Sequence, residues 1–285
     1  MNSRRSAFLS CFYWDYCSAS LLSIFQVYVK ATDSKGYNII MVQNNSETET
    51  MNVSFQKEPS LKLVKKERKL IKSKERVQHH GEVFTPNWMV KKMLAEPSIK
   101  AKLNDLHATF LEPSAGEGAF LIEILDQKLD YVDSISHKND WCENAIWALM
   151  SIYGIELLTD NILQARHLMI NIVTTHYQNF FNKALSNRTD FYKSALFVIN
   201  TNIVQGNALT YMNDSNLPIT FSEWNQVDKN TVKRDEFTYR SLFDDETDDV
   251  PQGQLSLFDF DDDQDQKKQS YAICPVTKVY KEIKE

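Results

Sequence analysis

The chain has 285 residues, of which 42% are hydrophobic, 12% aromatic and 25% charged, so it can bury a core of ordinary size. Its longest apolar stretches are shorter than the roughly 18 residues that a membrane-spanning helix needs, which predicts a protein without a membrane span. The four cysteines form no Cys-x-x-Cys pair, and no Cys/His cluster has zinc-ligand spacing. These patterns exclude a disulfide scaffold and a structural zinc site, and they favour a reducing, cytoplasmic compartment.

Charge is distributed unevenly along the chain. Residues 244–265 include ten acidic residues and no Lys or Arg, so removing that segment from the total charge of −6 leaves +4 on the remainder. Within the remainder, Lys57–Arg76 holds nine basic residues against three Glu. Such a basic arm can lie on nucleic-acid phosphates, and it is also typical of a solvated surface helix.

The first fifty residues differ from the rest because they are rich in aromatic residues, Ser and Cys. Ser3-Arg4-Arg5 and the apolar residues after it loosely imitate an export signal, but Asp15 interrupts the apolar region. A start of translation at Met51 is the other interpretation. We therefore divide the chain into a poorly ordered extension (1–50), a basic helical arm (51–80), a folded domain (81–227) and an acidic, largely flexible tail (228–285).

From Gly81 onward, helix and strand signals alternate. Thr85 and Pro86 have the chemistry of a helix N-terminus, and apolar residues then recur at helical spacing until Pro97. A long helix is expected from Thr159 to Phe181. Three short apolar stretches are predicted to be buried strands: Ala108–Leu111, Ile152–Leu157 and Ile203–Gln205. This alternation predicts an α/β fold with a parallel sheet, in which ligands bind at the carboxyl ends of the strands.

Candidate binding residues follow each of the three strands. Gly116 and Gly118 lie in the turn after the first strand, where the backbone bends tightly and a helix N-terminus then offers N–H groups to an anion. Glu156 ends the second strand, where a carboxylate can accept hydrogen bonds from both ribose hydroxyls. Asn207, after the third strand, can reach the adenine edge of a nucleoside. Each has a simpler interpretation, because tight turns need glycine without a ligand, a strand can end in a surface carboxylate, and Gly-Asn is an ordinary turn.

Four motifs in this region resemble the cofactor half of the adenine-specific DNA methyltransferases of restriction-modification systems. They are Gly81–Pro86 (GEVFTP), Phe110–Phe120 (FLEPSAGEGAF), Ile152–Leu157 (IYGIEL) and Gly206–Leu209 (GNAL). The resemblance covers about residues 81–209, and the stretch from Glu112 to Phe120 is its most specific part. It implies a Rossmann-like class I methyltransferase fold, S-adenosylmethionine as the cofactor and DNA as the substrate.

The resemblance also implies which residues contact the cofactor. Thr85 and Pro86 would border the carboxylate of the methionine moiety. Glu156, followed by Leu157, would bind the ribose hydroxyls. Asn207, followed by Ala208, would face the adenine amine, where relatives often have Asp. The amino-acid moiety would lie against the turn residues Glu112, Pro113, Ser114, Ala115, Gly116, Gly118 and Phe120.

The catalytic element of that family is missing from this sequence. Family members hold the flipped adenine amine with an Asp/Asn-Pro-Pro-Tyr/Phe loop after the fourth strand, and no Pro-Pro, Asn-Pro or Asp-Pro dipeptide occurs here. We therefore assign no catalytic residue, and we expect a chain truncated before the catalytic strand, with a second polypeptide supplying that loop and target recognition. The alternatives are a non-catalytic module that docks to a sliding clamp or nucleic acid, and methylation of RNA or protein by the same fold.

Two further features bear on partners and metals. Gln254-Leu255-Ser256-Leu257-Phe258 resembles the peptide with which bacterial replication and repair proteins dock onto the sliding clamp. A chance apolar island, or a strand that covers a sheet edge, is the other interpretation of this pentapeptide. His79 and His80 are adjacent, so their side chains diverge, and without a third ligand nearby in sequence they predict no metal site.

Overall fold

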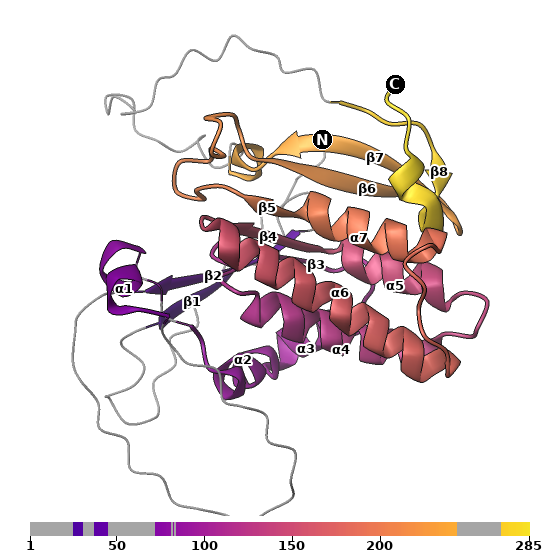
Figure 1. Cartoon of the computed structure of the whole chain (residues 1–285), viewed down its shortest axis with the longest axis horizontal. Coiled ribbons are helices and arrows are strands. Elements are labelled where there is room, and N and C mark those ends of the chain that lie inside the picture. The colour runs from indigo at the N-terminus through magenta and orange to yellow at the C-terminus, as the bar shows by residue number, and fades with distance from the viewer. Residues whose placement is uncertain (1–24, 31–36, 45–71, 81, 83, 244–268) are drawn as a thin grey trace, which may run out of the picture.

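A five-stranded sheet forms the centre of the protein, in the order β1-β2-β3-β4-β5 (Figure 1). The computed structural model describes residues 25–30, 37–44, 72–80, 82, 84–243 and 269–285. Three strands are parallel neighbours: β3 (Thr109–Glu112), β4 (Ile152–Glu156) and β5 (Ile203–Gln205). The strands predicted from sequence are thus confirmed to within one residue, and they are parallel as expected.

Two further strands extend the sheet beyond β3. β2 (Tyr37–Asn44) pairs with β3 in parallel, and β1 (Phe25–Lys30) pairs with β2 in the antiparallel direction. Both strands fall within the segment 1–50, which the sequence predicted to be a poorly ordered extension. That prediction is therefore wrong for these two stretches, where β2 forms backbone hydrogen bonds with the free edge of β3.

Helices cover one face of the sheet (Figure 1). α4 (Ala119–Ile135) and α5 (Trp141–Met150) connect β3 to β4, and α6 (Thr159–Phe181) and α7 (Asp190–Asn202) connect β4 to β5. Both crossovers advance across the sheet in the same direction, and parallel crossovers are right-handed, so all four helices fall on the same face. Among the described residues, no helix combines the length and the apolar character needed to cross a membrane.

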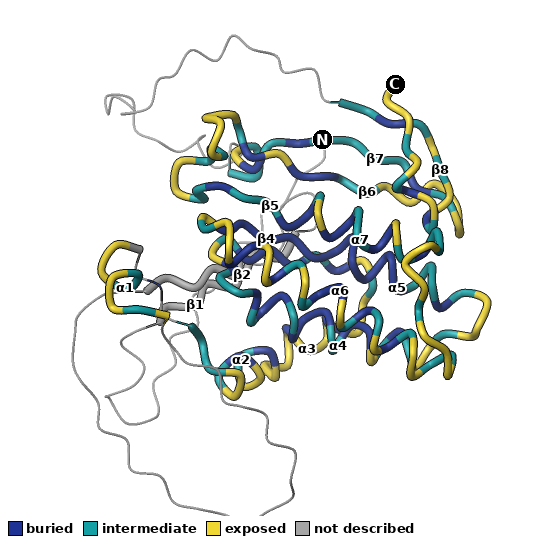
Figure 2. Tube along the Cα trace, in the orientation of Figure 1, coloured by how far each residue is buried: buried dark blue, intermediate teal, exposed yellow. Residues whose placement is uncertain are grey.

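Three shorter helices precede β3. They are α1 (Lys74–His80), α2 (Asn87–Leu94) and α3 (Pro97–Leu103), and both α2 and α3 pack on α4. Alternate strand residues, namely Phe110, Ile152 and Ile203, point toward the helices and join their apolar side chains in one core. In Figure 2 the buried residues, coloured dark blue, lie along the central strands and on the helices that cover them.

A β-hairpin covers the opposite face of the sheet. It consists of β6 (Thr220–Asp228) and β7 (Thr231–Thr238), and β8 (Cys274–Pro275) adds a short third strand. Tyr153 of β4 packs against Phe221 of the hairpin and donates a hydrogen bond to the Ser222 carbonyl oxygen at 2.8 Å. Among the described residues, two 3₁₀ helices complete the fold: η1 (Arg240–Leu242) and η3 (Val276–Lys281), of which η3 packs on α7.

The expected boundary between folded domain and acidic tail is therefore also wrong. It was placed after residue 227, which lies inside β6, and residues 231–243 and 269–285 belong to the folded structure. The apolar residues of β6 recur at every third position (Phe221, Trp224 and Val227) instead of alternating with polar ones, so the sequence lacks the period-2 signal of a half-buried strand. Of the basic arm, residues 74–80 form α1, whereas 51–71 lie outside the described residues.

A buried histidine joins α4 to α6. His176 is 7% exposed, and its Nδ1 lies 2.7 Å from Asp133 Oδ2 while its Nε2 lies 3.1 Å from Asp126 Oδ1. Burial alone would lower the pKa of His176, but the two carboxylates outweigh it and raise that pKa. Because each ring nitrogen faces a carboxylate oxygen, the imidazole is held as a cation between the helices.

We expect His176→Gln to destabilise the protein more at pH 6 than at pH 9. The pKa of His176 is higher in the folded protein than its value of 6.5 in the unfolded chain, so protonated His176 stabilises the fold. This contribution is complete below pH 6.5 and is lost as the pH rises through the pKa of the folded protein. Denaturant unfolding at both pH values should show a loss of about 2 kcal/mol at pH 6 and a smaller loss at pH 9. His167→Gln, at an exposed position of α6, is the control. Equal losses at the two pH values would contradict the cationic bridge.

Candidate functional site

Two buried carboxyl groups lie at the ends of adjacent parallel strands. Glu112 ends β3 and is 3% exposed, and Glu156 ends β4 and is 6% exposed. In the register of this pair, Glu112 lies opposite Gly154, so Glu156 extends two residues further toward the carboxyl edge. The simpler interpretation of Glu156 as a surface carboxylate is excluded by its burial.

Glu156 is held by donors from three directions. Its Oε2 accepts a hydrogen bond from the Gly116 N–H at 2.6 Å, in the turn that follows β3. Its Oε1 accepts from the Leu158 N–H at 2.9 Å and from Asn161 Nδ2 at 3.3 Å. These bonds stabilise the charge of a buried carboxylate and fix its orientation between the turn and α6.

Glu112 has far fewer donors. Its Oε1 accepts from the Ser114 N–H at 3.1 Å, whereas Oε2 is buried and has no hydrogen-bond partner among the described residues. Burial raises the pKa of Glu112 to about 8; the Ser114 N–H opposes this shift and the neighbouring Glu156 adds to it. Since buried polar atoms are almost always paired, the free oxygen marks a position where a donor from water or a ligand fits.

The turn between these two acids depends on its glycines. Gly116 has φ +55° and Gly118 has φ +86°, a left-handed conformation that other residues adopt only with strain. A Cβ on Gly118 would also lie 2.9 Å from Ala165 Cβ of α6, whereas one on Gly116 would meet only the Phe84 ring at 3.8 Å. Backbone conformation and the packing of α4 on α6 therefore account for both glycines, which agrees with the simpler interpretation that a tight turn needs them.

Three polar residues, Arg76, Glu82 and Asn161, form a hydrogen-bonded chain that reaches Glu156, and this chain was not predicted from the sequence. Asn161, which is 1% exposed, donates through Nδ2 to Glu82 Oε1 at 2.6 Å as well as to Glu156. Arg76 binds both Glu82 oxygens, through Nε at 2.5 Å and Nη2 at 2.8 Å. Burial would raise the pKa of Glu82, but the hydrogen bonds from Arg76 and Asn161 lower it. Asn161 lies in the expected first turn of α6 and Glu82 in the Gly81–Pro86 motif, so both positions were visible in the sequence, but their contact was not.

Most of the residues assigned by resemblance lie around this turn. Thr85 and Pro86 are partly buried immediately before α2, and Ala115 donates its N–H to the Ile155 carbonyl oxygen at 2.9 Å. Of the other turn residues, Pro113 is partly buried and Ser114 is exposed, and Leu157 is 44% exposed. Phe120 is the exception, because its side chain is 6% exposed and packs in the core with the helices.

Asn207 is held in a local turn after β5. Its Oδ1 accepts a hydrogen bond from the Leu209 N–H at 2.9 Å, and its own N–H donates to the Met212 carbonyl oxygen at 2.8 Å. Asn207 and Ala208 are both partly exposed. The interpretation as an ordinary Gly-Asn turn therefore accounts for the side-chain oxygen, and a contact with adenine would use the remaining acceptor capacity of that oxygen.

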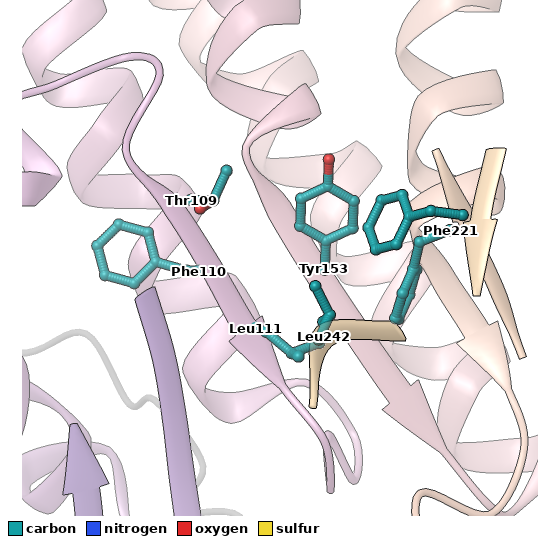
Figure 3. A pocket seen from close by; sticks show the side chains of 7 residues that line it. Thr109, Phe110, Leu111, Tyr153, Phe221 and Leu242 are labelled. Atoms are coloured by element: carbon teal, nitrogen blue, oxygen red, sulfur yellow. The ribbon is translucent and has the colours of Figure 1, made fainter. Parts of the chain in front are cut away.

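An apolar cleft lies away from the turn, between the sheet and the hairpin (Figure 3). Phe221 and Phe237 of the hairpin and Leu242 of η1 line one side of it, and strand residues Thr109, Phe110, Leu111 and Tyr153 line the other. No charged side chain lines this cleft, so it lacks the acids that mark the carboxyl ends of β3 and β4. We therefore place the candidate site at the glycine turn.

Comparison with known proteins does not identify the chain. No family model matches it, and no similar protein was found among curated proteins or solved structures. The structure itself defines a mixed α/β protein with a parallel sheet and flanking helices, which is compatible with a Rossmann-like fold. The sliding-clamp motif, Gln254–Phe258, lies outside the described residues.

We expect Glu112→Gln to stabilise the ligand-free protein at pH 8 and to have little effect at pH 5. The folded pKa of about 8 lies above the unfolded value of 4.5, so the stability contributed by Glu112 is full below pH 4.5 and declines as the pH rises toward 8. Glutamine has no proton to lose, and it should raise the free energy of unfolding by about 2 kcal/mol at pH 8. Denaturant unfolding at both pH values, with Glu223→Gln on β6 as the control, measures this. A loss of stability at pH 8 would show that the Glu112 carboxylate has donors of its own.

Proposed function

We propose that this protein binds S-adenosylmethionine at the glycine turn and forms the cofactor-binding part of an adenine-specific DNA methyltransferase. The observation that carries the proposal is the pair of buried acids, Glu112 and Glu156, on either side of Gly116. They belong to the same motifs that resemble the methyltransferase family. The fold supports the proposal because ligands of parallel α/β sheets bind beyond the carboxyl ends of the strands.

The charge of the site supports a cationic ligand. Two cations, Lys72 and Arg76, lie among the acidic side chains around the turn, so the balance of charge there is negative. The five acids are Glu82, Glu112, Glu117, Glu156 and Asp160. Phosphates of a nucleotide would be repelled by these carboxylates at short range. S-adenosylmethionine has no phosphate, and it carries a sulfonium and an ammonium group. Its single carboxylate suits the N–H groups at the start of α4.

The two buried acids, Glu112 and Glu156, fit different parts of S-adenosylmethionine. The free Oε2 of Glu112 would accept a hydrogen bond from the ammonium group, which would favour the charged form of Glu112. Glu156 has two oxygens with about four acceptor positions, of which Gly116, Leu158 and Asn161 occupy three, so one position remains for a ribose hydroxyl. These residues bind and orient the cofactor, and methyl transfer from sulfonium to amine then depends mainly on proximity.

The catalytic loop is proposed to come from residues outside this sequence, on a partner chain that also recognises the DNA target. The sequence contains none of the Pro-Pro dipeptides with which family members hold the adenine amine. The same observation supports the alternative function, a non-catalytic module that keeps the cofactor fold and docks to a sliding clamp or nucleic acid.

Titration calorimetry of the full chain tests cofactor binding. We expect the wild type to bind S-adenosylmethionine and not ATP, because the acids around the turn repel phosphates. Glu156→Gln should weaken binding by about a hundredfold, since one buried charge-assisted acceptor is lost. Glu223→Gln, on the distant hairpin, should bind as the wild type does. A wild-type chain that shows no affinity for S-adenosylmethionine would overturn the proposed function.

A methyl-transfer assay tests the proposed division of labour. We expect the chain alone, with labelled S-adenosylmethionine and DNA, to transfer no methyl group to adenine, because it lacks acceptors for the amine. Transfer should appear when a polypeptide that carries an Asn-Pro-Pro-Tyr or related loop is added. Efficient methylation of adenine by the chain alone would show that the catalytic acceptors lie within it.

A further inference from the structure

Two cations lie beside the glycine turn of the candidate site. Lys72 Nζ lies 2.9 Å from Glu117 Oε1 of the glycine turn, 2.9 Å from Asp160 Oδ2 and 2.6 Å from Asn161 Oδ1 at the start of α6. Arg76 of α1 binds Asp160 through Nη1 at 2.9 Å and Nη2 at 3.1 Å. Residues 72–80, 82 and 84, called the strap below, are thereby fastened to two elements that lie up to 89 residues away in the sequence.

The strap also packs on the turn through an aromatic ring. A Cβ built on Gly116 would lie 3.8 Å from the Phe84 ring. Lys72 Nζ lies 5.6 Å from the centroid of the same ring. A ligand that approaches the backbone of Gly116 from this side meets Phe84 and Lys72 first.

The ionic contacts, called the latch below, are partly exposed. The side chains of Lys72 and Arg76 are 28% and 27% exposed, and that of Asp160 is 52% exposed. The hydrogen bonds from Arg76 and Lys72 hold the pKa of Asp160 at about 2, so the latch stays charged at neutral pH. Ion pairs at such exposure are weak individually and are screened by salt, so the latch can open without unfolding the domain.

The latch is connected to the ribose acid of the proposed site. Arg76 binds Glu82, Glu82 accepts from Asn161, and Asn161 donates to Glu156. Lys72 binds the side-chain oxygen of Asn161, which turns its amide nitrogen toward the two glutamates. Closing the strap therefore places Asn161 so that it adds a third hydrogen bond to those that Glu156 receives from Gly116 and Leu158.

We propose that the strap is a gate over the cofactor site, with Lys72 and Arg76 as positioning residues that close it and orient Glu156. The inference rests on the proposed function for the identity of the ligand. An open latch admits S-adenosylmethionine, and the closed latch retains it and aligns Glu156 through Asn161. Exchange of the cofactor is then limited by opening of the latch, and it becomes faster at high salt.

The release rate of the bound cofactor tests the gate. Full-length protein is loaded with labelled S-adenosylmethionine and chased with unlabelled compound at low and at high salt. The double variant Lys72→Met, Arg76→Gln should release the label about tenfold faster than the wild type at low salt, since several charge-assisted contacts are lost. Its rate should hardly change with salt, whereas the wild-type rate should rise. Arg76→Lys keeps the positive charge but cannot bind both oxygens of Glu82 at once, so it should give an intermediate release rate.

The control removes the same two charges elsewhere. Lys100→Met on α3 and Arg188→Gln before α7 are exposed positions, and their double variant should behave as the wild type. Equal release rates and equal salt dependence in the wild type and the strap variant would overturn the gate while leaving the proposed function intact. Failure of the wild type and of both double variants to bind the cofactor would overturn the proposed function and the gate with it.

Discussion

The hydrogen bond from the Gly116 N–H to Glu156 holds the candidate site together. It joins the turn after β3 to the end of β4, across 40 residues of sequence. Because the carboxylate is 6% exposed, it depends on the donors it receives from Gly116, Leu158 and Asn161, and a buried acceptor left unpaired costs about 1–3 kcal/mol. The carboxylate of Glu156 therefore links the left-handed turn to the start of α6. Asn161 extends this link to Glu82, so a change at any of these positions affects the others.

The two acids of the site differ in how fully the protein satisfies them. Glu156 receives three hydrogen bonds from protein donors, whereas Glu112 receives one and keeps a buried oxygen without a partner among the described residues. The described part of the chain thus carries an unfavourable feature that none of its own contacts removes. A ligand that brings a cationic donor to Glu112 converts this cost into affinity, which is how a functional site differs from a merely stable turn.

The parts of the fold that the sequence predicted are those that depend on local signals. The strand Ile203–Gln205 and the helix ending at Phe181 were predicted because apolar periodicity and turn residues define them within one segment. The hairpin of β6 and β7 was missed because its burial comes from side chains of a sheet that lies elsewhere in the sequence. The same holds for the site: its acids and glycines could be found at strand ends, but Asn161 meets Glu82 across 79 residues, and no spacing rule reveals such a contact.

Under the proposed function, a catalytic strand supplied by a partner chain would find the free edge of β3 already occupied by β2. In a doubly wound sheet of order 3-2-1-4-5-6, the fourth strand pairs with the first, on the side away from the second. Here β3 is the first strand, β4 the second and β5 the third, and β2 lies on the free side of β3 in the parallel direction. An added fourth strand can reach β3 only after β2 has left it. Three residue pairs join β2 to β3, whereas six join β2 to β1, so the hairpin of β1 and β2 would have to separate from β3 as one unit.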